Sequence, residues 1–327
     1  MLKKLITSLC VGVILFLFIS SVPLVLANGE WKTVDDKTYL YIDNKLATGW
    51  QTLNGRKYFF DNSGVLMTQF GIDVSRYQGT IDWEKVKNDG VEFAIIRTGA
   101  RGWGTGKLIF DKKFENNIKG AMAQGINCGV YFYTQAIDEE EAIEEANFVL
   151  ESLKKVKITP EKLTYPVFFD IEDPEVGKKA RTYKLNTKQR TDICIAFSET
   201  IKKAGFVPMI YSSKGWFKNK LDTPLLSEQY GIWLAHWTKQ TNYEGEYKLW
   251  QYSEKGKVDG IKGKVDMNVS FLLAQPPQES YILLISIISA CVILLTASAL
   301  FINVKFIRKK KKAKKRKVFT KKLRKTA

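Results

Sequence analysis

Between residues 71 and 271 the sequence alternates short apolar runs with segments of helical periodicity, and this alternation limits the possible folds more than any other feature. An apolar run bounded by turn residues predicts a buried strand. Residues 138–156 are typical of the helical segments, because Ile143, Ala146 and Leu153 fall on one face and a dense acidic face lies opposite. The last three apolar runs leave almost no room for helices between them. The expected strands are 71–74, 93–98, 128–133, 166–171, 207–212, 232–237 and 248–252, with a last one near Asp266.

Strands and helices that alternate in this way and close on themselves predict an α/β fold, an incomplete TIM-like β/α barrel of parallel strands whose last helices are missing. In such barrels the reactive groups lie at the carboxyl ends of the strands. Asp73, Asp170 and Glu172 occupy such positions in the expected strands. We therefore expect a functional site at the barrel mouth, with the glycine-rich segment 102–107 as a mobile loop above it.

Residues 165–174 (YPVFFDIEDP) form an apolar run that ends abruptly in three acids and a proline. Because side chains alternate along a strand, Phe168, Asp170 and Glu172 share one face. Two carboxyl groups packed side by side against aromatic rings cannot both ionise easily, so burial and like-charge repulsion separate their pKa values. One proton donor beside one anion is the arrangement that glycoside hydrolysis requires. The alternative is that these acids cap the next helix or bind a metal in a surface loop, a role that suits Asp173 better than Asp170.

Histidine and cysteine are too scarce for most metal or thiol chemistry. His236 is the only histidine, whereas a zinc hydrolase normally uses two or three, and we expect it to be a satisfied polar residue near the barrel rim. Cys10 and Cys291 lie in apolar terminal segments, while Cys128 and Cys194 are expected to be buried thiols or, alternatively, a single disulfide. Carboxylates remain as the reactive groups, and we expect no cofactor and no metal.

The net charge of +17 belongs to the ends of the chain. Residues 305–327 are crowded with Lys and Arg and contain no acid, Lys3 and Lys4 begin the chain, and the rest is close to neutral. A basic run beside an apolar segment is first a sign of membrane topology, because the cytoplasmic flanks of membrane spans are enriched in positive charge. We therefore expect no nucleic-acid partner; nucleic-acid binding by the tail is the weaker interpretation.

Two apolar terminal segments predict secretion and anchoring. Residues 1–27 combine a basic start, an apolar stretch and a small residue before polar sequence, which predicts a signal peptide or, if it is not cleaved, an N-terminal anchor. Residues 281–304 contain no charge and are long enough to cross a bilayer, after a linker at 274–280. No Leu-Pro-x-Thr-Gly motif precedes this span, so we expect a retained transmembrane helix, residues 305–327 as a cytoplasmic tail, and the body of the protein outside.

Residues 28–69 differ in texture from the barrel, with aromatic, Gly and Asn residues in short alternations. The pattern Leu-x-Thr-x-aromatic occurs at 46–50 and again at 66–70, which predicts a small β-hairpin repeat. Residues 49–61 resemble the cell-wall-binding, or choline-binding, repeats of Gram-positive surface proteins, with one good copy and one degenerate copy. A short β spacer packed on the next domain is the alternative. If the resemblance holds, the wall-binding residues are Trp50, Tyr58 and Phe60.

Four motifs in residues 70–273 resemble a second known family. They are Gly-Ile-Asp-Val-Ser-x-Tyr-Gln-Gly at 71–79, Asp-Ile-Glu at 170–172, Leu-Trp-Gln-Tyr at 249–252, and the stretch from Val258 to Asn268. In this order and spacing they resemble glycoside hydrolase family 25, the muramidases that include the Chalaropsis-type lysozymes. The resemblance implies a β/α barrel with fewer than eight helices and cleavage of the β-1,4 bond from N-acetylmuramic acid to N-acetylglucosamine in peptidoglycan.

The resemblance also implies roles for individual residues. Glu172 would be the general acid, and Asp170 the neighbouring anion that supports the positive charge on the sugar directly or orients the substrate's acetamide as internal nucleophile. Asp73 and Asp266, from the first and last strands, would tune hydrogen bonding and charge; for Asp266 a turn residue is the alternative. Aromatic rings at strand ends would stack on sugar faces, and we expect about half of them to touch substrate. The expected substrate-binding residues are Tyr77, Tyr131, Tyr133, Tyr211, Trp233, Trp250, Gln251 and Asn268.

Together these expectations describe a membrane-anchored extracellular muramidase on a bacterial, Gram-positive cell membrane. Its partners would be peptidoglycan strands, a wall polymer held by the N-terminal repeat, and the membrane through residues 281–304. A non-catalytic, membrane-anchored peptidoglycan-binding or scaffold protein on the same barrel is the alternative from another class, although all four acids are present. Hydrolysis of another N-acetylated polysaccharide, such as chitin, is the third hypothesis.

Overall fold

A computed structural model describes residues 29–174 and 176–272. The predicted signal peptide (1–27), linker (274–280), membrane span (281–304) and basic tail (305–327) lie outside these residues. Within the described part of the chain, none of the helices has both the length and the apolar character needed to cross a membrane.

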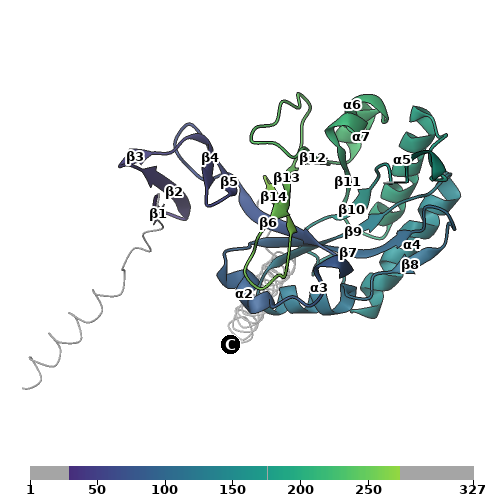
Figure 1. Cartoon of the computed structure of the whole chain (residues 1–327), viewed down its shortest axis with the longest axis horizontal. Coiled ribbons are helices and arrows are strands. Elements are labelled where there is room, and N and C mark those ends of the chain that lie inside the picture. The colour runs from purple at the N-terminus through teal and green to yellow at the C-terminus, as the bar shows by residue number, and fades with distance from the viewer. Residues whose placement is uncertain (1–28, 175, 273–327) are drawn as a thin grey trace, which may run out of the picture. The chain divides into compact units, whose positions relative to one another are not determined.

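Eight strands form a closed ring at the centre of the molecule (Figure 1). Going round the ring, the hydrogen-bonded order is β6-β14-β13-β12-β11-β10-β9-β7, and β7 pairs with β6 to close it. The predicted barrel is therefore confirmed, with a strand near each expected position. The strands are β6 (Gln69–Val74), β7 (Phe93–Arg101), β9 (Asn127–Tyr133), β10 (Val167–Asp170), β11 (Pro208–Ser213), β12 (Ile232–Ala235), β13 (Leu249–Gly256) and β14 (Val265–Ser270).

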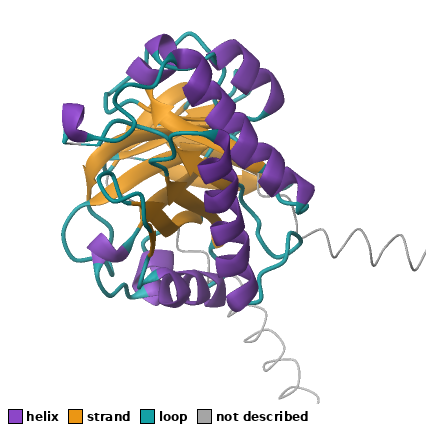
Figure 2. Ribbon diagram, turned by 90° about the vertical axis from the view of Figure 1, so that its right-hand side faces the viewer, coloured by secondary structure: helices purple, strands orange, loops and turns teal. Residues whose placement is uncertain are grey.

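Helices follow the early strands, and Figure 2 shows them around the central strands. In the described residues no helix lies between β12 and β13 or between β13 and β14, as the short spacing predicted. A short strand, β8 (Leu108–Phe110), pairs antiparallel with the end of β7 outside the ring. The helices are α2 (Trp83–Asn88), α3 (Phe114–Ala123), α4 (Glu139–Lys155), α5 (Thr187–Lys203), α6 (Lys214–Asn219) and α7 (Thr223–Gln229), with 3-10 turns η1 (Arg76–Gln78) and η2 (Gly177–Lys179).

Helix α4 matches the predicted segment, and Asp138 caps it by accepting a hydrogen bond from the Glu141 backbone N–H at 2.9 Å. Its buried face is rotated from the expected one. Ile143 is 41% exposed, whereas Glu145, expected on the acidic outer face, is fully buried. The cause is Arg101 at the end of β7, whose guanidinium pairs with Glu145 at 2.7 Å.

The last strand departs from the predicted all-parallel barrel. β14 runs antiparallel to both β13 and β6, because only a short turn joins β13 to β14. The start of β14, not its end, therefore lies at the rim where the other strands end. This reversal places Asp266 directly opposite Asp73 in the strand pairing.

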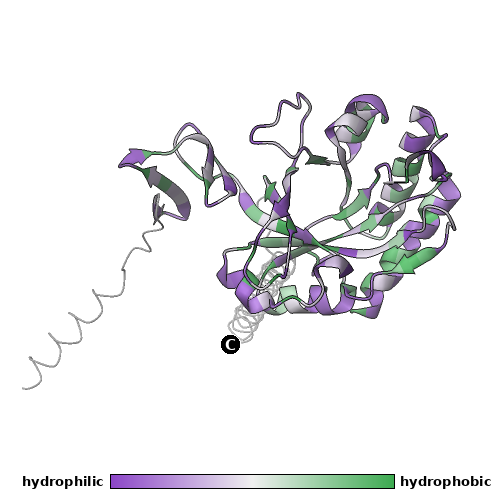
Figure 3. Ribbon diagram, in the orientation of Figure 1, coloured by the Kyte–Doolittle hydropathy of each residue, from purple (hydrophilic) through white to green (hydrophobic). Residues whose placement is uncertain are grey.

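The two faces of the barrel strands pack different layers. Phe93, Phe168, Met209, Trp233 and Leu249 belong to a cluster inside the ring. The alternate positions, such as those of β10 that face α5, pack against the surrounding helices. Figure 3 shows hydrophobic colour along the barrel strands and mixed colour on the helices. Cys128 and Cys194 are both buried and free, so the disulfide alternative is wrong.

The segment before the barrel is a β-hairpin module, as expected. Strands β1 (Glu30–Val34), β2 (Lys37–Ile42) and β3 (Lys45–Leu46) form an antiparallel sheet, and β4 (Gly49–Leu53) pairs with β5 (Arg56–Phe60). Two-residue turns at 35–36, 43–44 and 54–55 have positive φ at both positions, which Asp, Asn and Gly tolerate.

The β4–β5 hairpin packs on the outside of the barrel. The Trp50 ring meets the Trp250 ring edge-on at a centroid distance of 5.3 Å. Lys57 extends over the same Trp250 ring, 5.1 Å from its centroid, and donates a hydrogen bond to the Lys239 carbonyl. Arg56 forms an ion pair with Asp89 at 2.8 Å. The hairpin thus covers the outer face of β13, where no helix is present.

Candidate active site

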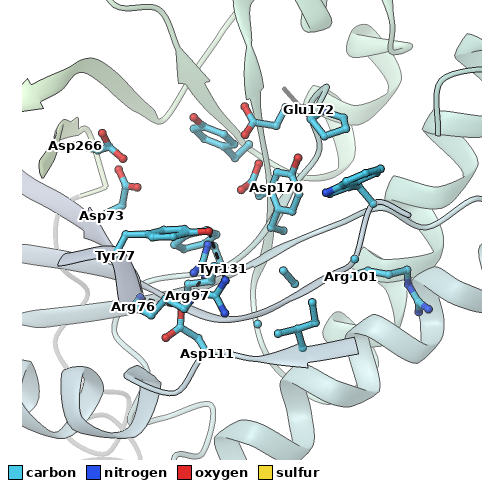
Figure 4. Close-up of a pocket in the computed structure, with 18 of the residues that line it drawn as sticks. Asp73, Arg76, Tyr77, Arg97, Arg101, Asp111, Tyr131, Asp170, Glu172 and Asp266 are labelled. Carbon is cyan, nitrogen blue, oxygen red and sulfur yellow. Dashed lines mark hydrogen bonds and ion pairs between the residues drawn. The ribbon is translucent and has the colours of Figure 1, made fainter. Parts of the chain in front are cut away.

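A pocket of about 1000 Å³ lies at the barrel mouth, and every strand of the ring contributes to it (Figure 4). Ten of the predicted catalytic and substrate-binding residues line this pocket, whereas Trp250 and Asn268 do not. Residues 102–105 of the glycine-rich loop also line it, as expected. The ten residues are Asp73, Tyr77, Tyr131, Tyr133, Asp170, Glu172, Tyr211, Trp233, Gln251 and Asp266.

Asp73 is held by side-chain amide groups from β13 and β14, the last two strands of the barrel. Its Oδ2 accepts hydrogen bonds from Gln251 Nε2 at 2.8 Å and from Asn268 Nδ2 at 2.7 Å. Asn268 is fully buried behind Asp73, and its own Oδ1 accepts from Trp233 Nε1 at 2.8 Å. Asn268 therefore fixes Asp73 from beneath the pocket.

Gln251 joins this network to the pocket wall. Its Oε1 accepts hydrogen bonds from the Tyr211 hydroxyl and from Trp237 Nε1, both at 2.9 Å. Because Oε1 accepts two donors, the orientation of the amide is fixed and its Nε2 must point to Asp73. The pocket floor is thus a connected set of hydrogen bonds before any ligand enters.

Asp170 and Glu172 follow each other at the end of β10. Asp170 is 5% exposed, and its Oδ1 is buried without a hydrogen-bond partner among the described residues. The turn that carries Glu172 is fixed on the side away from the pocket. There Ser212 Oγ donates to the Ile171 carbonyl at 2.5 Å, and Trp216 Nε1 donates to Asp173 Oδ2 at 3.0 Å. Asp173 therefore braces the turn, and this leaves Asp170 and Glu172 facing the pocket (Figure 4).

Burial raises the pKa of all four carboxyl groups, because the charged form loses hydration. Burial raises the pKa of Glu172 to about 7, and the charges of Asp73 and Asp173 add to the shift. Burial, followed by repulsion from Glu172, raises the pKa of Asp170 well above its usual range. Burial and the Asp73 charge raise the pKa of Asp266 to about 9.

Asp73 and Asp266 lie opposite each other in the strand pairing, so the protonation of each depends on the other. Burial also raises the pKa of Asp73, but its hydrogen bonds from Gln251 and Asn268 oppose the shift. These donors favour the ionised form of Asp73, so Asp266 is the partner that keeps the proton. Four crowded acids therefore do not carry four charges near neutral pH.

Three exposed aromatic rings surround the pocket. Tyr77 is 73% exposed, Trp103 44% and Trp237 55%, so their faces are open to a ligand. Tyr211 and Trp233 are buried and form the wall beneath. Sequence analysis did not select Trp103 or Trp237. Trp103 lies within the glycine-rich segment 102–107, and Trp237 is the last residue of the expected strand 232–237; these positions are the signals that could have found them.

The pocket also contains charges that sequence analysis missed. Arg97 on β7 pairs through Nε with Asp111 Oδ2 at 2.8 Å, and the same oxygen accepts the Arg76 backbone N–H at 2.9 Å. The guanidinium groups of Arg76 and Arg97 lie 5.2 and 5.0 Å from the centroid of the Tyr77 ring. Arg76 and Tyr77 are neighbours in the sequence, but the contacts of Arg97 with Asp111 and Tyr77 join different segments, so no local pattern predicts them.

Several predicted residues lie elsewhere. Trp250 points to the outer face of the barrel, is buried against the hairpin, and donates from Nε1 to the His236 carbonyl at 2.8 Å. Its place on β13 alternates with Gln251, which faces inward, so both could not line the pocket. His236 pairs through Nδ1 with Thr241 Oγ1 at 2.9 Å, as expected of a satisfied polar residue.

The predicted wall-binding residues are largely packed. Phe60 is fully buried in the core of the hairpin module, and the Tyr58 ring meets Trp31 edge-on at 5.1 Å. Trp50 packs on Trp250 and on Phe271. These contacts agree with the alternative of a spacer packed on the next domain.

A closed β/α barrel with paired carboxyl groups and open aromatic rings at its mouth defines a glycoside hydrolase. Residues 72–261 match the family described as glycosyl hydrolases family 25, more than half of the chain, and the chain belongs to this family. Residues 48–66 match a putative cell wall binding repeat.

Individual relatives agree with this assignment. The chain is 29% identical to lysozyme M1 of Streptomyces globisporus over 214 residues, which cover 64% of this chain and 68% of that one. The modular autolysin LytC of Streptococcus pneumoniae, solved with a synthetic peptidoglycan ligand, is 29% identical, with a TM-score of 0.57 over 73% of this chain. The chain spans only 57% of that autolysin. The lysozyme of Streptomyces coelicolor is 27% identical, with a TM-score of 0.51 over 61% of this chain and 90% of the lysozyme.

Proposed function

We propose that this protein is a muramidase that hydrolyses the β-1,4 bond between N-acetylmuramic acid and N-acetylglucosamine in peptidoglycan. One observation carries the proposal: Asp73, Asp170, Glu172 and Asp266 converge in a single pocket at the barrel mouth. The lysozymes and the autolysin among its relatives support this substrate.

Glu172 is the general acid in this proposal. Its pKa of about 7 lets it keep a proton near neutral pH and still release it to the glycosidic oxygen as the bond breaks. The proton then sits on the leaving sugar, and the carboxylate of Glu172 is ready to accept a proton from the attacking water in the second step.

Asp170 orients the acetamide group of the substrate. Its buried Oδ1 has no hydrogen-bond partner among the described residues, so it is a free acceptor for an amide N–H. Burial favours the protonated form of Asp170, but an N–H donor and a growing positive charge on the sugar both favour its anion. Direct support of that positive charge by Asp170, without the acetamide, is the alternative.

Asp73 and Asp266 keep the charge of the site in balance. The anion of Asp73 raises the pKa of Glu172, while the proton held by Asp266 limits the total negative charge in the pocket. The exposed rings of Tyr77, Trp103 and Trp237 would stack on the C–H faces of the sugars and position the strand.

We place this reaction outside the cell. Residues 1–27 would direct export, residues 281–304 would hold the protein in the membrane, and residues 305–327 would remain in the cytoplasm. The enzyme would then remodel the wall of the cell that makes it, and the repeat at 48–66 would add contact with a wall polymer. Finding the active protein mainly in cell-free medium would contradict the anchored arrangement.

The test is digestion of purified peptidoglycan by the full chain, followed by mass spectrometry of the soluble products. Wild type should release fragments with a new reducing N-acetylmuramic end. Glu172→Gln should lower the rate by about 10²- to 10⁴-fold, the usual contribution of a positioned acid. Glu246→Gln, at an exposed glutamate outside the pocket, is the matched control and should keep the wild-type rate.

Two outcomes would reject the proposal. No fragments from wild-type protein that is folded and sediments with the wall would favour the binding or scaffold function. Faster hydrolysis of chitin than of peptidoglycan would identify a different N-acetylated substrate.

A further inference from the structure

One wall of the pocket carries a positive charge that the structure leaves uncompensated. Arg76 lines the pocket on η1, and among the described residues it forms no ion pair. Its guanidinium carbon lies 5.2 Å from the centroid of the Tyr77 ring, and its Nη2 donates to the Tyr77 hydroxyl at 3.5 Å. The other arginines of the pocket differ, because Arg97 is paired with Asp111 and Arg101 with Glu144 and Glu145.

The position of Arg76 is fixed although its charge is free. The buried carboxylate of Asp111 accepts the Arg76 backbone N–H at 2.9 Å, and its other oxygen accepts the Lys113 backbone N–H at 2.9 Å. Ser75 and Gln78 form a capping box around the same turn. The backbone of Arg76 is therefore held at the rim, and its guanidinium stands beside the exposed Tyr77 ring.

The positive charge of Arg76 does not serve to compensate the four pocket carboxyl groups. Arg97 is among the charges that oppose the raised pKa of Asp170. Arg76 is not among the principal charges acting on Asp73, Glu172 or Asp266. Figure 4 shows Arg76 below Tyr77, on the side of the pocket away from Glu172.

We propose that Arg76, together with the exposed face of Tyr77, binds a carboxylate carried by the muramic acid side of the substrate. A guanidinium matches a carboxylate with two parallel N–H donors, and the ring beside it accepts the sugar or the adjoining apolar group. This inference rests on the proposed function, and it makes Arg76 the residue that distinguishes peptidoglycan from an uncharged polymer such as chitin.

The carboxylate has two chemical sources in peptidoglycan. In strands that carry stem peptides, the lactyl group of muramic acid is joined to the peptide by an amide, so the free carboxylates belong to the peptide. In strands stripped of peptide by an amidase, the lactyl carboxylate itself is free. A third substrate, stripped strands whose lactyl carboxylates have been converted to methylamides, has neither.

The experiment compares kcat/KM of the full chain on these three substrates, for wild type and Arg76→Gln. The variant should lose about ten- to a hundredfold on a carboxylate-bearing substrate, the range expected for a charged hydrogen bond, and less than about twofold on the methylamide strands. Loss on stripped strands identifies the lactyl carboxylate. Loss confined to peptide-bearing strands identifies the peptide carboxylates. Equal loss on all three substrates, or loss on none, would overturn the inference.

Two controls separate this result from other causes. Lys112→Gln removes an exposed positive charge outside the pocket and should leave all three rates unchanged; a loss equal to that of Arg76→Gln would show a general charge effect and reject the inference. Calorimetric binding of all three substrates in a Glu172→Gln background, with and without Arg76→Gln, tests Arg76 without turnover. If wild type cleaves none of the substrates, the proposed function fails, while this binding measurement still decides the role of Arg76.

Discussion

Arg101→Met should destabilise the barrel strongly, because Arg101 is the centre of a buried charge cluster. Arg101 is 3% exposed at the end of β7, and its Nε lies 2.7 Å from Glu145 Oε1. Its Nη2 pairs with Glu144 Oε2 at 2.6 Å, and its Nη1 donates to the Gly106 carbonyl at 2.7 Å. The methionine side chain keeps most of the apolar volume of the arginine but leaves the fully buried Glu145 without its cation.

The expected loss in the free energy of unfolding follows from the burial of Glu145. Breaking a buried ion pair by removing one partner costs about 3–5 kcal/mol, because the remaining charge stays buried. For a domain of this size such a loss lowers Tm by about 6–20 °C. Replacing both charges by apolar groups removes the buried charge, so the double variant Arg101→Met/Glu145→Met should recover more than half of the lost stability.

The loss should also depend on pH. Burial raises the pKa of Glu145 to about 7, and Arg101 opposes that shift, so the pKa rises further in Arg101→Met. Below the unfolded value near 4.5 both states hold the proton, and the missing cation costs little. Unfolded Glu145 releases its proton as pH rises through about 4.5, so wild type and variant both lose stability between that pH and their folded pKa values. The wild-type loss stops near pH 7, where folded Glu145 ionises beside Arg101, whereas the variant keeps the proton and continues to lose stability above pH 7.

Urea unfolding of wild type, the single variant and the double variant at pH 5 and pH 8 measures the loss of stability, its recovery in the double variant and its dependence on pH. We expect the single variant to lose most at pH 8, least at pH 5, and to be less stable than the double variant at pH 8. A loss below about 1 kcal/mol at pH 8, or a double variant as unstable as the single one, would refute the reasoning.

Three further predictions concern the pocket. Because Glu172 must hold a proton and its pKa is about 7, kcat/KM should fall about tenfold per pH unit above 7; a flat profile from pH 6 to 9 would contradict its role as acid. Asp266→Asn should raise Tm at pH 8 and leave it unchanged near pH 4, because the raised pKa of about 9 makes the native aspartate lose stability as pH rises; equal Tm values at pH 8 would count against the buried pair. Trp103→Ala should raise KM about 2- to 12-fold, the value of one aromatic contact, with kcat little changed, whereas Tyr183→Ala, at an exposed ring outside the pocket, should leave KM unaltered.

The parts of the fold that the sequence predicted are those set by local periodicity. Apolar runs located the eight strands because each strand is buried on both faces. Alternation placed Phe168 and Asp170 on the same inward face of β10, and the end of that strand located Glu172. Asp73, Asp170 and Glu172 could be found because an acid at the end of an apolar strand breaks the pattern around it, whereas Asp266, at the start of β14, was found through the family resemblance.

The parts that the sequence did not predict depend on contacts between distant segments. Glu145 looked like one more acid on the outer face of α4, and only its partner Arg101, 44 positions earlier, explains its burial. The aromatic content of the motif at 249–252 indicated Trp250 as a residue that stacks on a sugar, but alternation gives the inward position to Gln251. The sequence also did not predict that β14 runs antiparallel to its neighbours, because apolar runs predict strands but not their direction.

The β4–β5 hairpin occupies the outer face of β13, where a complete barrel would have a helix. Without a helix after β12 or β13, the outer face of β13 would expose Trp250 and Tyr252 to water. The β4–β5 hairpin covers that face instead. The Trp50 ring packs on Trp250, and the buried Lys57 amine lies 5.1 Å from the centroid of the Trp250 ring and 5.7 Å from that of Tyr252. Burying aromatic surface of this size stabilises a fold by about 1.5–3 kcal/mol per side chain, so these contacts compete with any ligand for the same ring. In this chain the aromatic face of the good copy of the repeat packs on the barrel, so a wall polymer would have to bind at another surface of the module.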